Sequence, residues 1–173
     1  ISSVFEETFI PYLGSAMEYA AVDTNVEVFA GCHYTALLAK VFGDEEYAKL
    51  LEERKVSLKE SINKYLWKED AGAYYPYDLR DKKNVDILMA STFNPLRFSI
   101  ADKEKKEKLI KLLKDDSHFN INTIPLTSVS KKDKMFTTTD GDYIGNASWS
   151  GNCWTLINEA VVRGLIDSGE EEL

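Results

Sequence analysis

Residues 141–169 read GDYIGNASWSGNCWTLINEAVVRGLIDSG, and the two halves of this stretch differ in character. Residues 141–152 are rich in Gly, Asn, Ser and Asp, with Tyr143 and Trp149 set among them. Because Gly and Asn accept unusual backbone angles, such a loop can shape itself around a ligand. Residues 153–166 have the apolar content of a buried helix. The stretch predicts a binding rim at the start of a buried helix; in the alternative, its tryptophans are ordinary packing residues.

Two helices of contrasting pattern are predicted earlier in the chain. The first covers residues 24–42, is apolar on most sides and starts at Asp23, a residue type that caps helices. A helix of this kind is expected to be buried on most faces. The second covers residues 45–67, with Asp44 as its cap and a single apolar stripe opposite Glu and Lys side chains. Together they predict an αα-hairpin with an inner and an outer member.

The inner and outer pattern continues along the chain. A short β-hairpin or extended loop is predicted at 68–80, and a second inner segment at 84–93 that stops at Asn94–Pro95. Asp102 caps a second outer helix at 102–115, and a long connection, expected to be ordered, leads to a third inner helix at 150–166.

This order of elements predicts an all-α fold, part of an (α/α) toroid in which inner helices line the axis and outer helices surround them. Short β-hairpins or extended loops would join the helices. An open α-solenoid would show the same alternation, but the chain lacks an internal repeat of solenoid type.

Composition excludes several classes of partner. The formal net charge of −8 argues against nucleic acid, because phosphate binding requires clustered Lys and Arg. No apolar run approaches the roughly 18 residues that span a membrane, and no signal peptide precedes Ile1 in the given sequence, so a cytoplasmic protein is favoured although the compartment is unknown. His33 and His118 are the only histidines and no metal-ligand spacing occurs, so no metal is expected. Cys32 and Cys153 are expected to be reduced thiols in buried helices, with a disulfide as the alternative.

Several segments, taken in order, resemble the six-hairpin (α/α) barrel glycosidases. They read AVDTN, INKYLWKEDAGAYYPYDL, FNPLRF, IPLTSVS and YIGNASWSGNCWTLIN. The resemblance covers nearly all of residues 20–169 and is greatest to the group that contains processing α-glucosidase I and mannosylglycerate hydrolase. That group often has Tyr-Trp-Arg-Gly-Pro at the tryptophan segment, whereas residues 147–152 read ASWSGN here. The arginine of the family pattern therefore has no counterpart at this point.

The resemblance implies hydrolysis of a glycosidic bond with inversion, with an oligosaccharide or glycoside as the substrate and no cofactor. Inversion uses a carboxylic acid and a carboxylate base roughly 6.5–9.5 Å apart. The resemblance places the acid before the V-D-x-N segment and the base after the tryptophan helix, outside residues 1–173. Within the chain, only Asp23 and Glu18 are candidates for the acid, and helix capping or surface charge is the commoner role for each.

The chain is accordingly expected to be a partial catalytic domain. A complete barrel has six hairpins, and the pattern above accounts for about two and a half of them. Residues 1–173 would then be one part of the domain, incomplete at both ends, and the remainder of its own chain would be a packing partner.

Substrate-binding residues are expected in the loops before the inner helices, where the toroid opens. The candidates are Asp23, Asn25, Tyr143, Trp149, Gly151 and Trp154. Tyr74 and Tyr75 could lie near them or pack in the core. Asn158 is expected to anchor two segments by hydrogen bonds, and a cavity-facing role is its alternative. His33 is expected to be a core histidine with its hydrogen bonds satisfied.

Two other functions fit the predicted fold. A sugar isomerase or epimerase could use the same toroid but needs a histidine in the cavity, and only His33 could serve. A non-catalytic helical scaffold that binds peptides would not need a tryptophan in a loop of Gly and Asn. We therefore expect a glycosidase.

Overall fold

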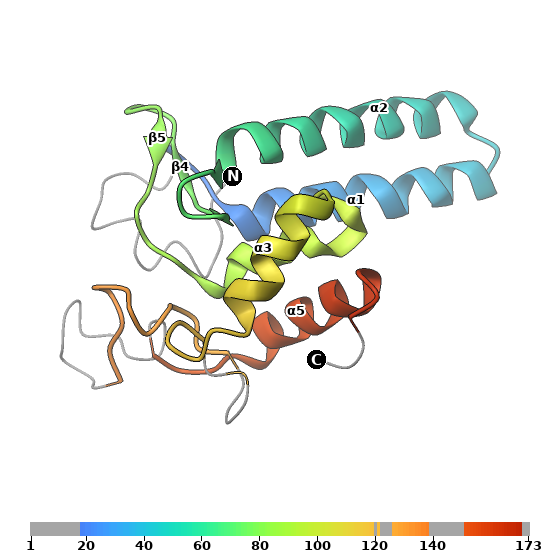
Figure 1. The fold of residues 1–173 in the computed structure, drawn as a ribbon. Helices are drawn as coiled ribbons and strands as arrows, with labels where there is room; N and C mark the ends of the chain where they lie inside the picture. The colour runs from blue at the N-terminus through green and yellow to red at the C-terminus, as the bar shows by residue number, and fades with distance from the viewer. Residues whose placement is uncertain (1–17, 120, 122–125, 139–150, 171–173) are drawn as a thin grey trace.

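The computed structural model describes residues 18–119, 121, 126–138 and 151–170 (Figure 1). Helices α1 (Val22–Val41) and α2 (Glu45–Ser61) form the predicted antiparallel hairpin, and a short π-helical segment, η4 (Ile62–Leu66), extends α2. Asp44 caps α2 as predicted, because its carboxylate accepts a hydrogen bond of 3.0 Å from the backbone N–H of Tyr47. Gly43 has φ +78° in the turn between the helices, a conformation that favours glycine.

The start of α1 differs from the prediction. The cap position is Ala21, without a side-chain cap, and Asp23 lies inside the first turn. Strand β1 (Tyr19–Ala20) pairs with a later strand and leads the chain directly into the helix. Asp23 instead accepts a hydrogen bond of 2.6 Å from the N–H of its neighbour Thr24.

Burial separates the two helices of the hairpin as expected, but only in part. The N-terminal half of α1 is buried at most positions, whereas Ala48 and Leu51 are the buried residues of α2. The expectation that α1 is buried on most faces is wrong for its C-terminal half, where α2 covers one side, including Ala36 and Ala39, and leaves the other sides open among the described residues. Its large apolar side chains are exposed: Tyr34, Leu37, Leu38 and Val41, followed by Phe42.

The segment after η4 contains the predicted short β-structure. Strand β2 (Trp67–Lys68) pairs with β3 (Ala73–Tyr74), and β4 (Tyr77–Asp78) pairs with both β5 (Lys83–Asn84) and β1. All of these pairings are antiparallel.

The second inner helix begins later than predicted. Residues 85–89 are not helical, because they align with a segment some forty residues further on: Met89 forms a β-bridge with Val129, and the N–H of Ser130 donates to the carbonyl of Leu88 at 2.9 Å. The segment that follows, η5 (Ala90–Ser99), has 3₁₀ geometry and is interrupted by a kink at Arg97 and Phe98, whose backbone angles are not helical. Its first part passes through Pro95, so the predicted stop at Asn94–Pro95 comes too early.

Two further helices complete the described fold. Helix α3 (Lys103–Leu113) has Asp102 as its cap, as predicted, with a hydrogen bond of 3.0 Å from the N–H of Lys105. Helix α5 (Thr155–Asp167) begins five residues later than the predicted 150–166, because the preceding residues pair with another segment. Cys153 forms a β-bridge with Thr127, and the carbonyl of Asn152 accepts from the N–H of Ser128.

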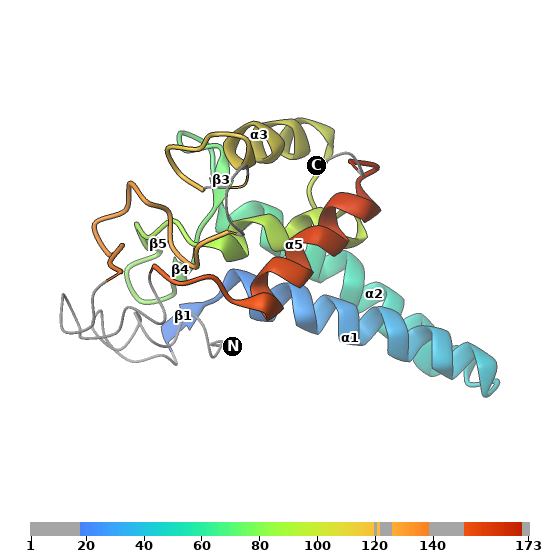
Figure 2. The ribbon, with the colours of Figure 1, turned by 90° about the horizontal axis from the view of Figure 1, so that it is seen from below.

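The inner helices are arranged with η5 between α1 and α5 (Figures 1 and 2). Helix α5 packs against η5, and η5 packs against α1, so α1 and α5 do not pack side by side as the sequence predicted. Gly164 of α5 permits the close approach, since a Cβ atom there would lie 2.9 Å from the Cβ of Leu96.

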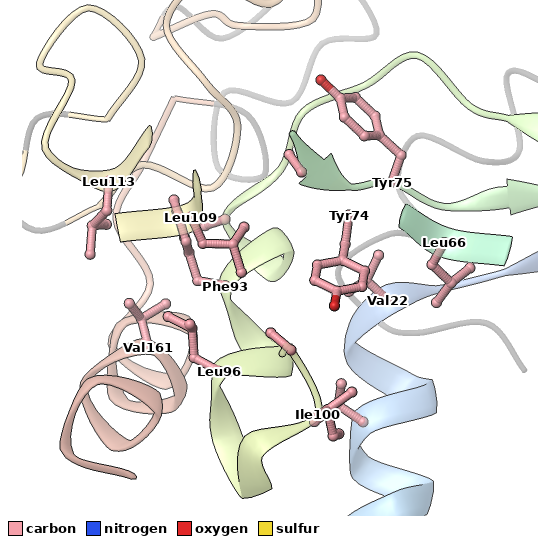
Figure 3. Packing of buried hydrophobic residues seen from close by; sticks show 14 of the residues in the cluster. Val22, Leu66, Tyr74, Tyr75, Phe93, Leu96, Ile100, Leu109, Leu113 and Val161 are labelled. Carbon is pink, nitrogen blue, oxygen red and sulfur yellow. The ribbon is translucent and has the colours of Figure 1, made fainter. Parts of the chain in front are cut away.

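The main core surrounds η5, and Figure 3 shows part of it. Leu96 of η5 points towards Val161 of α5, and Phe93 lies near Leu109 of α3. A smaller second core joins Val85, Ile87 and Met89 to other residues, namely Tyr19, Val129 and Met135.

Candidate functional site

A cavity of about 420 Å³ lies where α1, η5 and α5 face one another. Three carboxylates and two arginines contribute to its wall, together with small polar and apolar side chains. The lining residues are Asp23, Glu27, Met89, Ser91, Asn94, Arg97, Ser128, Leu156, Ile157, Glu159, Ala160 and Arg163. Because the cavity lies among the predicted inner helices and near the beginning of α1 and α5, it occupies the place where the toroid prediction puts a binding site.

The 3₁₀ geometry of η5 explains why this wall is polar. A 3₁₀ helix has three residues per turn, so side chains at i and i+3 lie in line. Ser91, Asn94 and Arg97 form one such line and all face the cavity. The neighbouring line, Ala90, Phe93 and Leu96, belongs to the main core. Because residues three positions apart lie on the same side of η5, its polar residues face the cavity and its apolar residues face the core.

Ion pairs hold two of the three carboxylates of the cavity. Arg97 of η5 reaches Glu27 of α1, and the Arg97 side chain is only 12% exposed, so this pair links two of the elements that form the wall. On α5, Arg163 pairs with Glu159 one turn away. Two of the three carboxylates are thus already engaged in ion pairs within the described chain.

Asp23 is the third carboxylate and the most buried, with 8% of its surface exposed. Its Oδ1 accepts from the backbone N–H of Thr24 at 2.6 Å. The first turn of a helix carries partial positive charge, which suits an acidic side chain at this position. Asp23 is therefore placed to bind a hydrogen-bond donor in the cavity.

The other predicted site residues near α1 lie elsewhere. Asn25 lines a separate cavity of about 410 Å³ with Tyr65 and Tyr77, and its amide donates to the carbonyl of Ala21 at 2.6 Å. Glu18, the second candidate acid, forms an ion pair of 3.1 Å with Arg80 and does not line the Asp23 cavity.

The tryptophan loop is described only from residue 151 onward, so Tyr143 and Trp149 lie outside the described residues. Gly151 is buried, and a Cβ atom there would lie 2.1 Å from the carbonyl oxygen of Thr137. Only glycine allows this contact. Trp154 precedes α5 and packs, half-buried, against the main core. Neither residue is among those that line the cavity.

The tyrosines of the β-hairpin belong to the core, which decides the alternative left open by the sequence. Tyr74 and Tyr75 are 1% and 7% exposed, and the Tyr74 hydroxyl donates to Asn63 at 2.7 Å. Burial raises the pKa of both phenols, that of Tyr75 to about 12. Phenols in this state are poor proton-transfer groups near neutral pH.

Asn158 is the predicted anchor. Its Oδ1 accepts from the N–H of Leu126 at 2.7 Å, and its Nδ2 donates to the carbonyl oxygens of Leu126 and Trp154 at 3.1 and 2.9 Å. One amide therefore joins α5 to the segment that includes the cavity residue Ser128.

The predictions for histidine and cysteine are partly confirmed. His33 is half-buried; its Nδ1 lies 3.1 Å from Nζ of Lys55, and its ring packs on Phe98. Neither cysteine is in a disulfide, but Cys153 is exposed and Cys32 only half-buried, so their predicted burial is wrong. Cys153 is exposed because α5 starts after it.

Asp23 is the one predicted site residue among those that line this cavity; the residues that the sequence analysis missed include Ser91, Asn94, Arg97 and Glu27. A signal for the first three was present, namely polar residues repeated every third position. The sequence does not show that this period is structural, because a period of three has meaning only once η5 is known to be a 3₁₀ helix.

Metal-binding clusters and membrane-spanning helices are both absent from the described residues. No group of three or more His, Cys, Asp or Glu side chains in that part of the chain could hold a metal ion. None of the described helices is long and apolar enough to span a membrane.

The sequence matches the family described as mannosylglycerate hydrolase MGH1-like glycoside hydrolase domain over residues 8–173. Periplasmic trehalase from Escherichia coli O1:K1 / APEC is 31% identical over 156 residues, which is 88% of this chain and 24% of the trehalase. The chain thus spans about a quarter of the curated relatives it matches.

Solved structures show the same fold. GH63 mannosylglycerate hydrolase from Thermus thermophilus in complex with Tris has a TM-score of 0.76 at 20% identity, over 93% of this chain and 36% of that one. Neutral trehalase Nth1 from Saccharomyces cerevisiae has a TM-score of 0.72 at 19% identity, over 91% and 30%. By its sequence match and its fold, the chain belongs to the MGH1-like family of glycoside hydrolase domains.

Proposed function

We propose that this chain forms one wall of the sugar-binding cavity of a glycosidase, and that the complete protein hydrolyses a glycosidic bond with inversion. The observation that carries the proposal is the polar cavity among α1, η5 and α5 in a chain of the glycoside hydrolase domain family. Residues 1–173 are in this view part of a longer catalytic domain that supplies the other walls.

The charges in the cavity support a binding role for this wall. An inverting enzyme needs one protonated carboxylic acid and one free carboxylate about 6.5–9.5 Å apart. Glu27 and Glu159 each form an ion pair with an arginine of the same wall, so their carboxylates are already engaged within the chain. We therefore assign the acid and the base to the part of the protein outside this chain, and assign Asp23 to hydrogen bonding of a sugar hydroxyl.

The proposed substrate is a small glycoside. The named relatives are trehalases and mannosylglycerate hydrolases, and the Thermus enzyme has also been solved in complex with glucose and with Tris and D-glycerate. A disaccharide or a glycosyl-glycerate fits these relatives best.

The isomerase alternative has no support in the described site. His33 and His118 do not line the cavity; His118 instead lies 2.9 Å from the hydroxyl of Ser130. An isomerase of this fold would need an imidazole within reach of the sugar.

The test is hydrolysis by the complete purified protein. Trehalose and mannosylglycerate are incubated with the wild type, and the anomer first released is identified by NMR. We expect cleavage of at least one substrate, release of the inverted anomer, and a loss of about tenfold or more in kcat/KM for Asp23→Asn. Asp102→Asn, a cap of an outer helix, is the matched control and should keep its activity. Absence of any glycoside cleavage by the complete protein would contradict the proposed function. Cleavage by residues 1–173 alone would contradict the assignment of the acid and the base to the part of the protein outside this chain.

A further inference from the structure

The backbone is strained at residues 97–99, where the chain turns out of η5 beside the cavity. Arg97 leaves helical geometry with ψ 145°, and Phe98 and Ser99 follow with φ of +56° and +52°. Positive φ is uncommon for any residue other than glycine, and here it occurs at two such residues in succession. Strain of this kind persists only where the surrounding structure enforces it, and it gathers at ligand-binding and active sites.

Three helices hold this turn in place. The N–H of Phe98 donates to Oδ2 of Asp167 on α5 at 3.2 Å, and Nζ of Lys59 on α2 donates to the carbonyl oxygen of Ser99 at 2.6 Å. The ring of Phe98 packs against Phe29 of α1, with the ring centroids 5.6 Å apart. The residue that opens the turn is therefore fixed relative to all three helices.

That residue, Arg97, presents hydrogen-bond donors to the cavity. Its guanidinium has five N–H donors, and Nη1 donates to Glu27, its one hydrogen-bond and ion-pair partner among the described residues. The buried side-chain atoms without a partner in that part of the chain belong to Glu18 and Asn94. The other nitrogens of Arg97 are not among them, so these nitrogens keep accessible surface and can bind a group in the cavity.

The ion pair alone does not explain why the strained turn is retained. The Glu27 side chain is 57% exposed, and ion pairs with an exposed partner contribute little to stability. A lysine could also form such a pair, because one N–H group is enough for it. The planar fork of donors is what an arginine adds at this position.

We infer that Arg97 is a substrate-binding residue that donates hydrogen bonds to an uncharged oxygen of the bound sugar, and that the strained turn at 97–99 sets its position. This inference rests on the proposed glycosidase function and identifies a contact within that site.

The chemistry of the cavity wall restricts the group that Arg97 binds. A guanidinium only donates, so its partner must accept, which excludes an ammonium group. The wall has one more carboxylate than it has arginines, so its net charge is negative and disfavours an anionic group. The hydroxyl and ring oxygens of a sugar accept hydrogen bonds without carrying charge.

The test compares the wild type with Arg97→Lys in the complete protein. Lysine keeps the positive charge beside Glu27 but lacks the planar fork. Glucose, mannose and D-glycerate are measured as competitive inhibitors. We expect Arg97→Lys to bind at least one of the two sugars about ten- to hundredfold more weakly than the wild type does, and to bind D-glycerate equally well. An inhibition constant does not depend on the folded fraction, so a less stable variant still gives a valid result.

Ser99→Gly is the matched control in the same turn. Ser99 is exposed and does not line the cavity, and glycine adopts its positive φ without strain. This variant should bind the sugars as the wild type does and melt at the same or a higher temperature.

The outcomes separate the inference from the proposed function. A wild type that cleaves glycosides, together with an Arg97→Lys variant that binds both sugars normally, would overturn the inference alone, whether or not the melting temperature falls. An equal or larger loss of D-glycerate binding would overturn it as well, because the partner of Arg97 would then be a carboxylate. A wild type that neither cleaves glycosides nor binds these sugars would remove the proposed function and the inference together.

Discussion

Trp149 and Trp154 lie five positions apart and are expected to have different roles. Trp149 lies outside the described residues, and its assignment to the cavity rim remains a prediction from the Ser, Gly and Asn around it. Trp154 packs against the main core just before α5, and its carbonyl oxygen accepts from the N–H of Asn158. The contrast between the two residues can be tested directly.

In the complete protein, Trp149→Ala should weaken sugar binding by about ten- to hundredfold, because an indole face stacked on a sugar contributes about 1–3 kcal/mol. Its melting temperature should be close to that of the wild type. Trp154→Ala should cost about 2–3 kcal/mol of unfolding free energy, below the range for a fully buried tryptophan, because the side chain is only half-buried. Inhibition constants and thermal melts of both variants decide the matter. A Trp149→Ala protein that melts early yet binds sugar normally would show that this ring is a packing residue.

Chemistry at single residues could be predicted from the sequence where the residue type restricts its role. An amide within an apolar helix must find partners, so the anchor role of Asn158 followed from its position. Asp23 was a site candidate and lines the cavity. Asn94 and Arg97 could not be found in this way, because what brings them into one line is the 3₁₀ period of η5.

At the scale of helices, the contact between α5 and η5 depends on Gly164. A methyl group there would lie 2.9 Å from the Cβ of Leu96 and 3.4 Å from the backbone nitrogen of Arg97, so backbone would have to move. Gly164→Ala should therefore cost about 1–3 kcal/mol despite the better helix propensity of alanine.

Gly31 is the matched control for this change. It lies in the middle of α1, where an added Cβ would meet nothing within 4 Å. Gly31→Ala, measured by urea unfolding of residues 1–173, should stabilise the chain by about 0.5–1 kcal/mol. Equal effects of the two substitutions would mean that the close approach of α5 to η5 is wrong.

The cap of α3 should make stability depend on pH. The hydrogen bond and positive charge of Lys105, with the backbone N–H groups of the first turn, hold the pKa of Asp102 below its usual range. The folded state therefore binds this proton less readily than the unfolded state. The contribution of the ionised Asp102 is fully present above the unfolded pKa of about 3.9 and is lost as pH falls through the folded pKa.

Asp102→Asn keeps a capping oxygen but lacks the charge. Denaturant melts of both proteins should show a stability difference that is largest near neutral pH, and that is lost as the pH falls below the unfolded pKa of about 3.9 and through the lower folded pKa. Asp44, which caps α2 in the adjacent hairpin, is the control. Among the described residues, Asp44 has no lysine or arginine partner of the kind that Lys105 provides for Asp102. A difference for Asp102→Asn that does not change with pH would exclude the charge as its cause.

Elements with local patterns were predicted well, and elements with distant partners were not. The hairpin of α1 and α2 and the cap of α3 follow from caps and periodicity within one segment. Residues 85–89 also have a clear period of two, since Val85, Ile87 and Met89 share the second core. The sequence analysis interpreted their apolar content as part of an inner helix. The segment with which they pair lies about forty residues further along the chain, so the pairing could not be seen within the segment itself.

At the scale of the whole molecule, the described chain leaves apolar faces open. Leu38 of α1 is 57% exposed, and Leu156 of α5 is 64% exposed, although both helices are inner members of the fold. The chain covers 36% of the Thermus hydrolase and 30% of the yeast trehalase, which have the same fold. We propose that further hairpins of the barrel cover these faces in the complete protein.

This proposal predicts different responses to one substitution at two exposed apolar sites. Leu38 is on the inner helix α1, and Val56, 60% exposed, is on the outer helix α2. If further hairpins cover α1, Leu38→Glu places an unpaired charge in an apolar interface, which should cost about 3 kcal/mol or more in the complete protein.

Val56→Glu adds a charge to the outer face, where water solvates it, and should change stability by no more than about 0.5 kcal/mol. Denaturant unfolding of the two complete proteins gives both values under the same conditions. If Leu38→Glu proved as harmless as Val56→Glu, the C-terminal half of α1 would face water in the complete protein as well. The apolar residues of that half would then need an explanation other than the packing of a barrel, because residues that remain in water gain nothing from being apolar.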